Sequence, residues 1–396
     1  MVEIGAAAGP RHRAERNRVS ALAIETGAEN RTDRPAVALA ARRSDAISIA
    51  RVICILGVVY VHAWTGLNGH DLESLRGTPQ DSLRWALMEI FGRSAVPLLG
   101  LISGWLVAGS SRTQDWLRHV GRKARTILLP MILWNGLAIL FVSGAAWILG
   151  LSAPVPSSTG WMFEELFIVS RNPDINVQMP FLRDLFLCMV AAPLFVRLPG
   201  WALGMIAAMA ALCQIMGWGP PVLMRASILF FFVMGIIARR EGLADRVAAL
   251  PWTVAAPPFV LLMSVQLFAS LHPGADGLGM GLPVLAMAVL DMTVRVAAAL
   301  FFWRLAWSLA ASGARGMLLR IEPFAFFLFC SHLILIWLGG PALGALFGKL
   351  GSPFYPAYLL VQPLLVLVVV VVLGSLLSRA SPRLARLLSG GRLMAA

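Results

Sequence analysis

Charged residues are scarce in this chain of 396 residues. They make up 13% of it, whereas apolar residues make up 58%. Soluble globular proteins carry about 25% charged residues, and a globule of this length cannot bury so much apolar surface. The shortage of charge therefore excludes an ordinary soluble protein and indicates that lipid surrounds most of the chain.

Cysteine is rare as well, with four residues in the whole chain. Cys54, Cys188, Cys213 and Cys330 all lie inside apolar runs, and no pair has the spacing of metal ligands. This excludes a disulfide framework and predicts that no metal is bound. Cys330 stands two positions before His332 and could in principle relay an acyl group, but apolar surroundings disfavour the reactive thiolate. We expect packing roles for all four.

Acidic residues are too few to balance the basic ones. The chain has 20 Asp+Glu against 33 Lys+Arg, which gives a formal net charge of +13. In a membrane protein this excess is typical of cytoplasmic loops that face anionic lipids. Nucleic-acid binding is the weaker interpretation, because the basic residues are not interleaved with stacking aromatic side chains on one patch. We expect membrane lipids, and no nucleic acid, among the partners.

Ten apolar runs predict an all-α fold, a polytopic membrane helix bundle of about ten transmembrane helices. The runs cover residues 46–65, 85–109, 126–150, 181–197, 200–218, 222–238, 250–270, 281–304, 321–340 and 357–378. In lipid a helix satisfies every backbone group within one segment, so even the β-branched run 366–373 is expected to be helical. We find no internal repeat and no soluble catalytic domain.

Basic residues alternate in number between consecutive gaps of these runs. The first gap holds Arg76 and Arg84, whereas the second holds Arg112, Arg118, Arg122, Lys123 and Arg125. Because cations collect on the cytoplasmic side, the pattern predicts an even number of helices with both termini cytoplasmic. We expect residues 1–44 to form a disordered basic cytoplasmic tail, 45–380 the transmembrane domain, and 381–396 a second basic cytoplasmic tail.

The first apolar run carries Arg51 and His62, eleven residues apart. Eleven residues make about three helical turns, which places both side chains on one face, about 16 Å apart along the axis. A cation and an imidazole on a membrane helix are costly unless they face a cavity or partners. The pair therefore predicts a site, a shared tunnel with Arg51 near the cytoplasmic end and His62 well across the membrane.

Other polar residues near the membrane allow two interpretations each. Arg93 can line the site or form an ion pair with Glu89, and Pro97 should loosen the helix beside it. Arg183 and Asp184 can anchor a helix at the outer interface, or they can orient a polar substrate.

His332 can belong to the site or can bridge two helices by a hydrogen bond. Counting along the helix from Glu322 places His332 about 15 Å deep in the membrane, whereas counting from Ala46 places His62 about 24 Å deep. Asp291 and Arg295 stand four residues apart and are expected to form a structural ion pair.

These residues suggest an acyl-transfer chemistry. Histidine titrates near working pH, so His62 can take a proton from a hydroxyl or accept an acyl group itself. The guanidinium of Arg51 suits the phosphates of a coenzyme A thioester, acetyl-CoA in the simplest case. The spacing of the two residues is comparable to that between those phosphates and the thiol. The acceptor would then arrive from the outer side, at Arg93, Arg183 and Asp184.

The stretch IARVICILGVVYVHAW, with ten residues between Arg51 and His62, resembles the first-helix motif of the acyltransferase-three family. Members of this family are integral-membrane bacterial enzymes that O-acylate cell-surface glycans. Similar stretches follow in order: RSAVPLLGLISGWL, FLRDLF, RASILFFFVMGIIA and FAFFLFCSHLIL. Together they extend from about Ile49 to Leu335. The first motif is fairly specific, and the others are diffuse apolar patterns.

The resemblance implies a ten-helix enzyme of the bacterial inner membrane, an acyl-CoA donor and His62 as the catalytic residue. The implied acceptor is a hydroxyl of an exopolysaccharide, O-antigen or other lipid-linked glycan. One feature departs from the family, which often has two arginines three apart, because Arg93 has Ile90 and Val96 at those positions. A transporter or flippase for glycans is the alternative, although transporters often show repeated halves.

Overall fold

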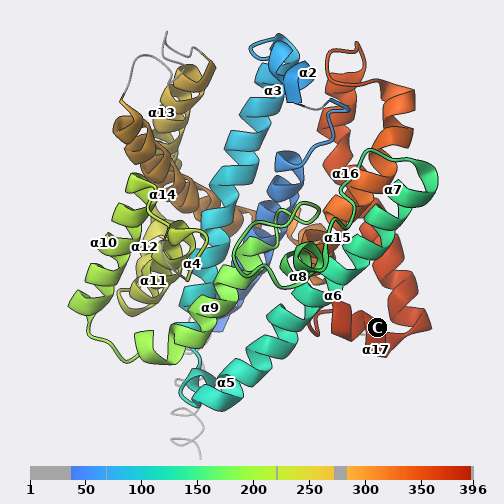
Figure 1. The fold of residues 1–396 in the computed structure, drawn as a ribbon. Helices are drawn as coiled ribbons and strands as arrows, with labels where there is room; N and C mark the ends of the chain where they lie inside the picture. Colours follow the sequence, from blue (N-terminus) through green and yellow to red (C-terminus); the bar gives the residue numbers. More distant parts are fainter. Residues whose placement is uncertain (1–36, 68, 220–221, 272–282, 394–396) are drawn as a thin grey trace, which may run out of the picture.

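The computed structural model describes residues 37–67, 69–219, 222–271 and 283–393, and every regular element among them is a helix. The expected all-α fold is therefore confirmed for these residues. Seven helices are long and apolar enough to cross a membrane (Figure 1). They are Val37–Val61, Pro79–Ala108, Trp116–Leu149, Trp252–Ser270, Val284–Leu309, Arg315–Phe347 and Tyr355–Ala380.

Several of these long helices consist of consecutive elements. The second contains α3 (Pro79–Leu87), the π-helix η1 (Met88–Arg93) and α4 (Ser94–Ala108); the third contains α5 (Trp116–Lys123), η3 (Ala124–Leu128), α6 (Leu129–Ala138), η4 (Ile139–Ser143) and α7 (Gly144–Leu149). The last four correspond to α13 (Trp252–Leu271), α14 (Val284–Leu309), α15 (Arg315–Phe347) and α16 (Tyr355–Ala380). Short helices α2 (Gly69–Ser74), η2 (Ser111–Thr113), α8 (Thr159–Phe167), α12 (Leu243–Ala249) and α17 (Pro382–Leu388) complete the connections.

The expected count of about ten spans is not confirmed, because three of the ten apolar runs form shorter helices. These are α9 (Pro180–Phe195), α10 (Gly200–Met216) and α11 (Ala226–Arg240), with 16, 17 and 15 residues. At about 1.5 Å per residue they measure roughly 23–26 Å, less than the ~30 Å of a bilayer core. Helix α11 packs against α4, α9 and α10. Its apolar composition thus reflects burial against other helices as well as any contact with lipid.

The described part of the first helix starts at Val37, about nine residues before the expected boundary. The extra turns belong to an alanine-rich stretch with high helix propensity. They are held by Arg42, whose Nη2 donates to the Trp307 carbonyl at 3.2 Å, and by Arg43, which lies 2.7 Å from Asp245. Part of the expected 1–44 tail is therefore helical, and residues 1–36 lie outside the described residues.

Neighbouring helices approach closely at glycines. A Cβ atom at Gly104 of α4 would collide with the Phe232 carbonyl of α11, and one at Gly235 would collide with the Leu101 carbonyl. Small residues that let two backbones touch are typical of helix packing in membranes. The π-helix η1 ends at Arg93, four residues before Pro97. Proline has no N–H for that carbonyl, which agrees with the expected loosening.

The segment after α16 is folded rather than extended. Helix α17 packs beside α6, where the Trp134 indole N–H donates to the Leu388 carbonyl at 2.9 Å (Figure 1). Ala385, Leu388 and Leu393 are buried. The expected basic tail at 381–396 is thus, as far as residue 393, part of the packed structure. Helices α5 and α17 lie at the end of the molecule opposite α2 and α3.

Candidate active site

His62 lies at the end of the first helix and not inside it. The helix stops at Val61, and the His62 N–H donates to the Val59 carbonyl at 3.2 Å in a tight turn. Beyond it, the Trp64 N–H donates to Gln362 Oε1 at 3.2 Å, and the Tyr355 hydroxyl donates to the Trp64 carbonyl at 3.0 Å. Both partners come from α16. The first helix thus ends earlier than the expected span 46–65. Beyond residue 61, side chains of α16 form hydrogen bonds with the backbone N–H and carbonyl of Trp64.

The Trp64 side chain fixes this turn against α15. A Cβ atom added at Gly340 or Gly344 would collide with the Trp64 ring. The indole therefore occupies space that α15 leaves open by having glycine at both positions. Because Trp64 follows His62 by two residues, this contact also positions the imidazole.

Three side-chain contacts connect the first helix to α15, and the first of them is the ion pair between Asp45 and Arg315 at 2.7 Å. Arg51 Nη1 lies 3.0 Å from Glu322 Oε1, and the rings of His62 and His332 have centroids 5.4 Å apart. Arg51 precedes His62 by eleven residues, and Glu322 precedes His332 by ten. The two helices therefore run side by side in the same direction, and the contacts of Arg51 and of His62 lie about three turns apart.

This pairing corrects the expected depths of the two histidines. The sequence count took Glu322 as the point where the ninth helix enters the membrane. In the structure α15 begins seven residues earlier, at Arg315, and Glu322 is a partner of Arg51 within the bundle. His62 and His332 consequently lie at one level.

His332 is fully buried, and its hydrogen bonds stay within its own helix. Its Nδ1 lies 3.1 Å from the Leu328 carbonyl and 2.9 Å from the Phe329 carbonyl. A carbonyl oxygen only accepts, so Nδ1 carries the proton and Nε2 holds a free electron pair. That Nε2 is buried with no hydrogen-bond partner among the described residues. His332 therefore does not bridge two of the described helices by a hydrogen bond. Its Nε2 remains free to accept a hydrogen bond, and its ring lies against that of His62.

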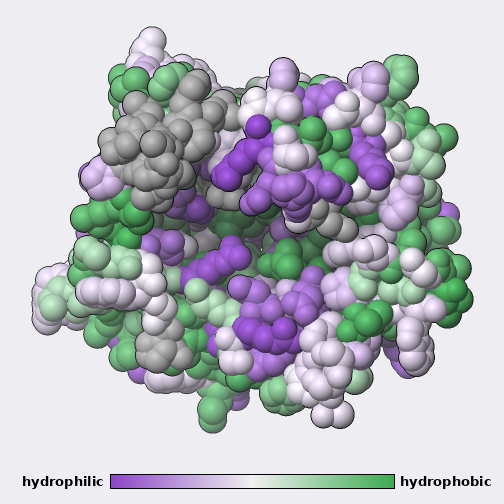
Figure 2. Space-filling view, turned by 45° about the horizontal axis from the view of Figure 1, so that its top comes forward, coloured by the Kyte–Doolittle hydropathy of each residue, from purple (hydrophilic) through white to green (hydrophobic). Residues whose placement is uncertain are grey.

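A cavity of about 530 Å³, here named the histidine cavity, is open beside His62. Its polar lining includes Gln178, Gln214, Arg225 and Arg295. Arg295 also binds Asp291 with both carboxylate oxygens, at 2.8 and 3.1 Å, which confirms the predicted ion pair. The end of the molecule that carries α2 and α3 is hollowed near its centre, with hydrophilic side chains around the hollow (Figure 2).

A second cavity of about 140 Å³, the basic cavity, contains Arg51. Its charged lining residues are Arg51, Lys123, Glu322 and Arg392. Three cations thus share the space with one carboxylate. Desolvation by the surrounding protein, followed by repulsion from Arg51, lowers the pKa of Arg392 to about 10. Arg392 therefore stays charged at neutral pH.

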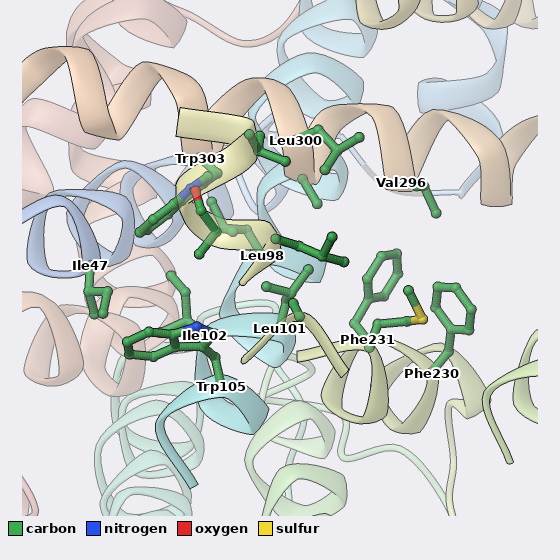
Figure 3. Close-up of a pocket in the computed structure, with 16 residues that line it drawn as sticks. Ile47, Leu98, Leu101, Ile102, Trp105, Phe230, Phe231, Val296, Leu300 and Trp303 are labelled. Carbon is green, nitrogen blue, oxygen red and sulfur yellow. The ribbon is translucent and has the colours of Figure 1, made fainter. Parts of the chain in front are cut away.

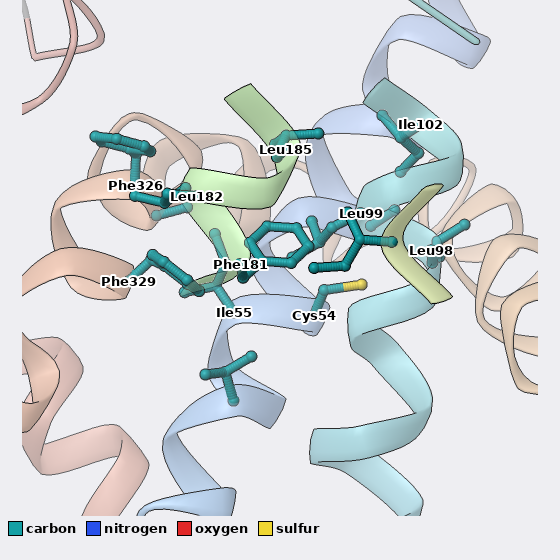
Figure 4. Close-up of a cluster of buried hydrophobic side chains, with 14 of the residues drawn as sticks. Cys54, Ile55, Leu98, Leu99, Ile102, Phe181, Leu182, Leu185, Phe326 and Phe329 are labelled. Atoms are coloured by element: carbon teal, nitrogen blue, oxygen red, sulfur yellow. The ribbon is translucent and has the colours of Figure 1, made fainter. Parts of the chain in front are cut away.

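Phe181 and Phe329 line both cavities. Their ring centroids are 5.8 Å apart with an interplanar angle of 58°. Figure 4 shows them in one apolar cluster with Cys54 and Ile55 of the first helix. The expected shared tunnel is therefore two cavities that meet at an aromatic wall, with Arg51 on one side and His62 on the other.

Arg183 and Asp184 hold a loop instead of lining either cavity. Arg183 lies 2.7 Å from Asp184 and donates to the Val222 and Val169 carbonyls at 2.8 and 3.1 Å. The fully buried Asp184 accepts the N–H of Arg225 at 2.8 Å. This geometry gives the pair a positioning role, since it fixes the loop from which Arg225 enters the histidine cavity.

Arg93 is the last residue of η1, and its side chain lies outside the described part of the structure. The buried Glu89, four residues before it, accepts a hydrogen bond from Gln266 Nε2 at 3.2 Å. The expected site role of Arg93 stays a prediction.

A third pocket is apolar throughout and lies apart from Arg51 and His62. It is formed by side chains of α4, α11 and α14, among them Leu101, Phe230 and Val296 (Figure 3). No group in it can transfer a proton or bind a charged ligand. We therefore assign it no part in the chemistry.

The sequence did not predict a site role for three basic residues of the two cavities, Lys123, Arg225 and Arg392. Lys123 and Arg392 counted only as cytoplasmic cations, and Arg225 counted only as an outer cation and as the first residue of the stretch RASILFFFVMGIIA. One available signal was that charge tends to gather at functional cavities. Another was the Gly390–Gly391 pair before Arg392, which indicates a turn instead of a continuing tail.

Comparison with known proteins shows which family this chain belongs to. The acyltransferase domain family matches residues 44–379, most of the chain. The succinoglycan biosynthesis protein ExoH of Rhizobium meliloti (strain 1021) is 27% identical over 369 residues, which cover 87% of this chain and 92% of that protein. No solved structure matches the chain significantly. The protein is therefore an acyltransferase and belongs to the Acyl_transf_3 family of acyltransferase domains.

Proposed function

We propose that the protein moves an acyl group, most simply acetyl, from a cytoplasmic coenzyme A thioester to a hydroxyl of a glycan. The observation that carries the proposal is the pairing of a basic cavity with a histidine cavity across one aromatic wall. The family match favours this enzyme over a transporter or flippase for glycans.

The donor occupies the basic cavity. Guanidinium groups bind phosphate oxygens through paired N–H donors, and Arg51 offers such a group about 16 Å along the helix from His62. This separation is comparable to that between the phosphates and the sulfur of an extended coenzyme A. The thioester end therefore reaches the histidine cavity between Phe181 and Phe329, while the phosphates stay behind.

His62 acts as the general base in the histidine cavity. It takes the proton of the acceptor hydroxyl as that oxygen attacks the thioester carbonyl. The new carbon–oxygen bond forms, the carbon–sulfur bond breaks, and the sulfur leaves as a thiolate that recovers the proton from the His62 imidazolium. The acceptor nitrogen of His332 stabilises that imidazolium.

The acceptor enters the histidine cavity from the hollowed end of the molecule (Figure 2). Because the relative ExoH is named for succinoglycan biosynthesis, we propose an exopolysaccharide or another lipid-linked glycan. The distribution of cations supports both termini, and the basic cavity, on the cytoplasmic side of a bacterial inner membrane. In this arrangement α9, α10 and α11 complete ten crossings.

Label transfer tests the proposal. Membranes that contain the wild-type protein, His62→Ala or His70→Ala are given radiolabelled acetyl-CoA, and the label in envelope glycan is measured. His70 lies on α2 and is exposed, so its variant is the matched control. We expect transfer by the wild type and the control and loss in His62→Ala. Undiminished transfer by His62→Ala would exclude the assigned role.

A further inference from the structure

The basic cavity holds more positive charge than its own residues neutralise. Glu322 is paired with Arg51 at 3.0 Å. Among the described residues, no carboxylate lies within ion-pair distance of Lys123 or Arg392. Like charges that share a small cavity repel each other, and a bound anion relieves this repulsion. The cavity is therefore suited to a ligand with more than one negative charge.

Arg392 is held in place by a built turn that follows α17. The buried Ser389 hydroxyl accepts the N–H groups of Arg392 and Leu393 at 3.1 and 2.9 Å. Gly390 and Gly391 have φ of 60° and 83°, which side-chain-bearing residues rarely adopt. These contacts fix the backbone of Arg392 at the edge of the basic cavity.

Contacts with the described residues orient the guanidinium of Arg392, but they occupy only one of its three nitrogen atoms. It lies 4.0 Å from the centre of the Phe326 ring, and its Nη1 donates to the carbonyls of Ser389 at 3.0 Å and Thr126 at 3.5 Å. Its Nε and Nη2 donate to none of the described residues. Two N–H-bearing atoms of a fixed guanidinium are therefore available to a ligand in the cavity.

We infer that the turn 389–393 is part of the donor site, and that Arg392 binds a phosphate of a nucleotide-type donor together with Arg51 and Lys123. This inference rests on the proposed function and adds to it the segment after α17 as a wall of the binding site. The ligand class is a polyphosphorylated nucleotide, such as the 3′,5′-ADP portion of coenzyme A. Arg51 can exchange Glu322 for a phosphate, whereas Arg392 and Lys123 have no carboxylate to exchange.

The test compares Arg392→Gln with Arg392→Lys and with Arg383→Gln, a matched exposed arginine on α17. A charge-assisted hydrogen bond is worth about tenfold or more in affinity. We expect Arg392→Gln to raise the KM for acetyl-CoA roughly tenfold and to change kcat by less than about twofold. Arg392→Lys should restore part of the loss, and Arg383→Gln should behave as the wild type.

Acetylpantetheine, which has no nucleotide phosphates, separates binding from folding. If Arg392 contacts phosphate, Arg392→Gln uses acetylpantetheine as well as the wild type does. Equal losses with both donors would show a purely structural role and overturn the inference.

Direct binding of 3′,5′-ADP to purified protein distinguishes this inference from the proposed function. Weaker binding by Arg392→Gln supports the inference even if no acyl transfer from acetyl-CoA is found. Unchanged binding overturns it even if transfer is found.

Discussion

The basic cavity and the histidine cavity share residues of the first helix and α15 but differ in the charged and titratable groups that line them. In the basic cavity the Arg51–Glu322 pair leaves two cations over. In the histidine cavity the cations are Arg225 and Arg295, Arg295 is paired with Asp291 at 2.8 Å, and the contact between the first helix and α15 is a pair of imidazoles. The difference agrees with the proposed division of labour, in which one level of the bundle binds the anionic donor and the other transfers a proton.

The largest effect that this division predicts comes from His62→Ala. Loss of a general base lowers the rate by about 10²–10⁴-fold. Binding of coenzyme A should not change, because His62 does not line the basic cavity. Single-turnover rates and equilibrium binding of coenzyme A check the two halves of this prediction. A variant that lost both together would show that the cavities do not act separately.

Arg51→Gln should have the opposite profile. Loss of a charge-assisted contact raises the KM for acetyl-CoA by roughly 10–100-fold, with a smaller change in kcat. The variant also leaves the Glu322 carboxylate to repel phosphate. Adding Glu322→Gln should therefore restore part of the donor affinity. Steady-state kinetics of both variants measure this, and a double variant no better than Arg51→Gln would contradict the shared site.

Phe329→Ala tests the wall between the cavities. Removing one ring widens the passage, so longer acyl groups should pass more easily. We expect the ratio of kcat/KM for butyryl-CoA to that for acetyl-CoA to rise roughly tenfold. Leu185→Ala is the control, because Leu185 lines the basic cavity but not the histidine cavity. If both variants shift the ratio equally, the aromatic pair does not select the acyl group.

The smallest effect is expected from Gly340→Ala, which pushes the Trp64 ring away from α15. Overpacking costs about 1–3 kcal/mol and should disturb the turn that carries His62. Gly339→Ala adds the same methyl group one residue earlier, where no atom lies within 4 Å. The thermal midpoint in detergent and kcat should both fall for Gly340→Ala, with kcat falling a few-fold, and neither should fall for Gly339→Ala.

The sequence allowed the helical class and several local pairs to be predicted. Each of the ten apolar runs contains a helix among the described residues, although only seven of these helices are long and apolar enough to cross a membrane, and the spacing of Asp291 and Arg295 identified their ion pair. What it could not supply was the relative depth of distant helices. The charge of Glu322 predicts a membrane boundary at that residue, and this boundary gives the wrong depth for His332 relative to His62.

The separation of the cavities was also beyond sequence reasoning. A helix spacing places Arg51 and His62 on one face, but it does not reveal which side chains of other helices come between them. Phe181 and Phe329 are ordinary apolar residues of their own runs, and only the tertiary packing makes them a wall. Arg183 and Asp184 likewise have clear partners only once the loop before α11 is folded.

The packing of α17 and the turn after it has a consequence for biogenesis. Arg51 is translated early, whereas Arg392 follows the last of the seven long helices, which ends at Ala380. A nascent chain that has already inserted all these helices still lacks one wall of the basic cavity. In the inferred donor site, full affinity for the donor is therefore reached only after translation has passed residue 392.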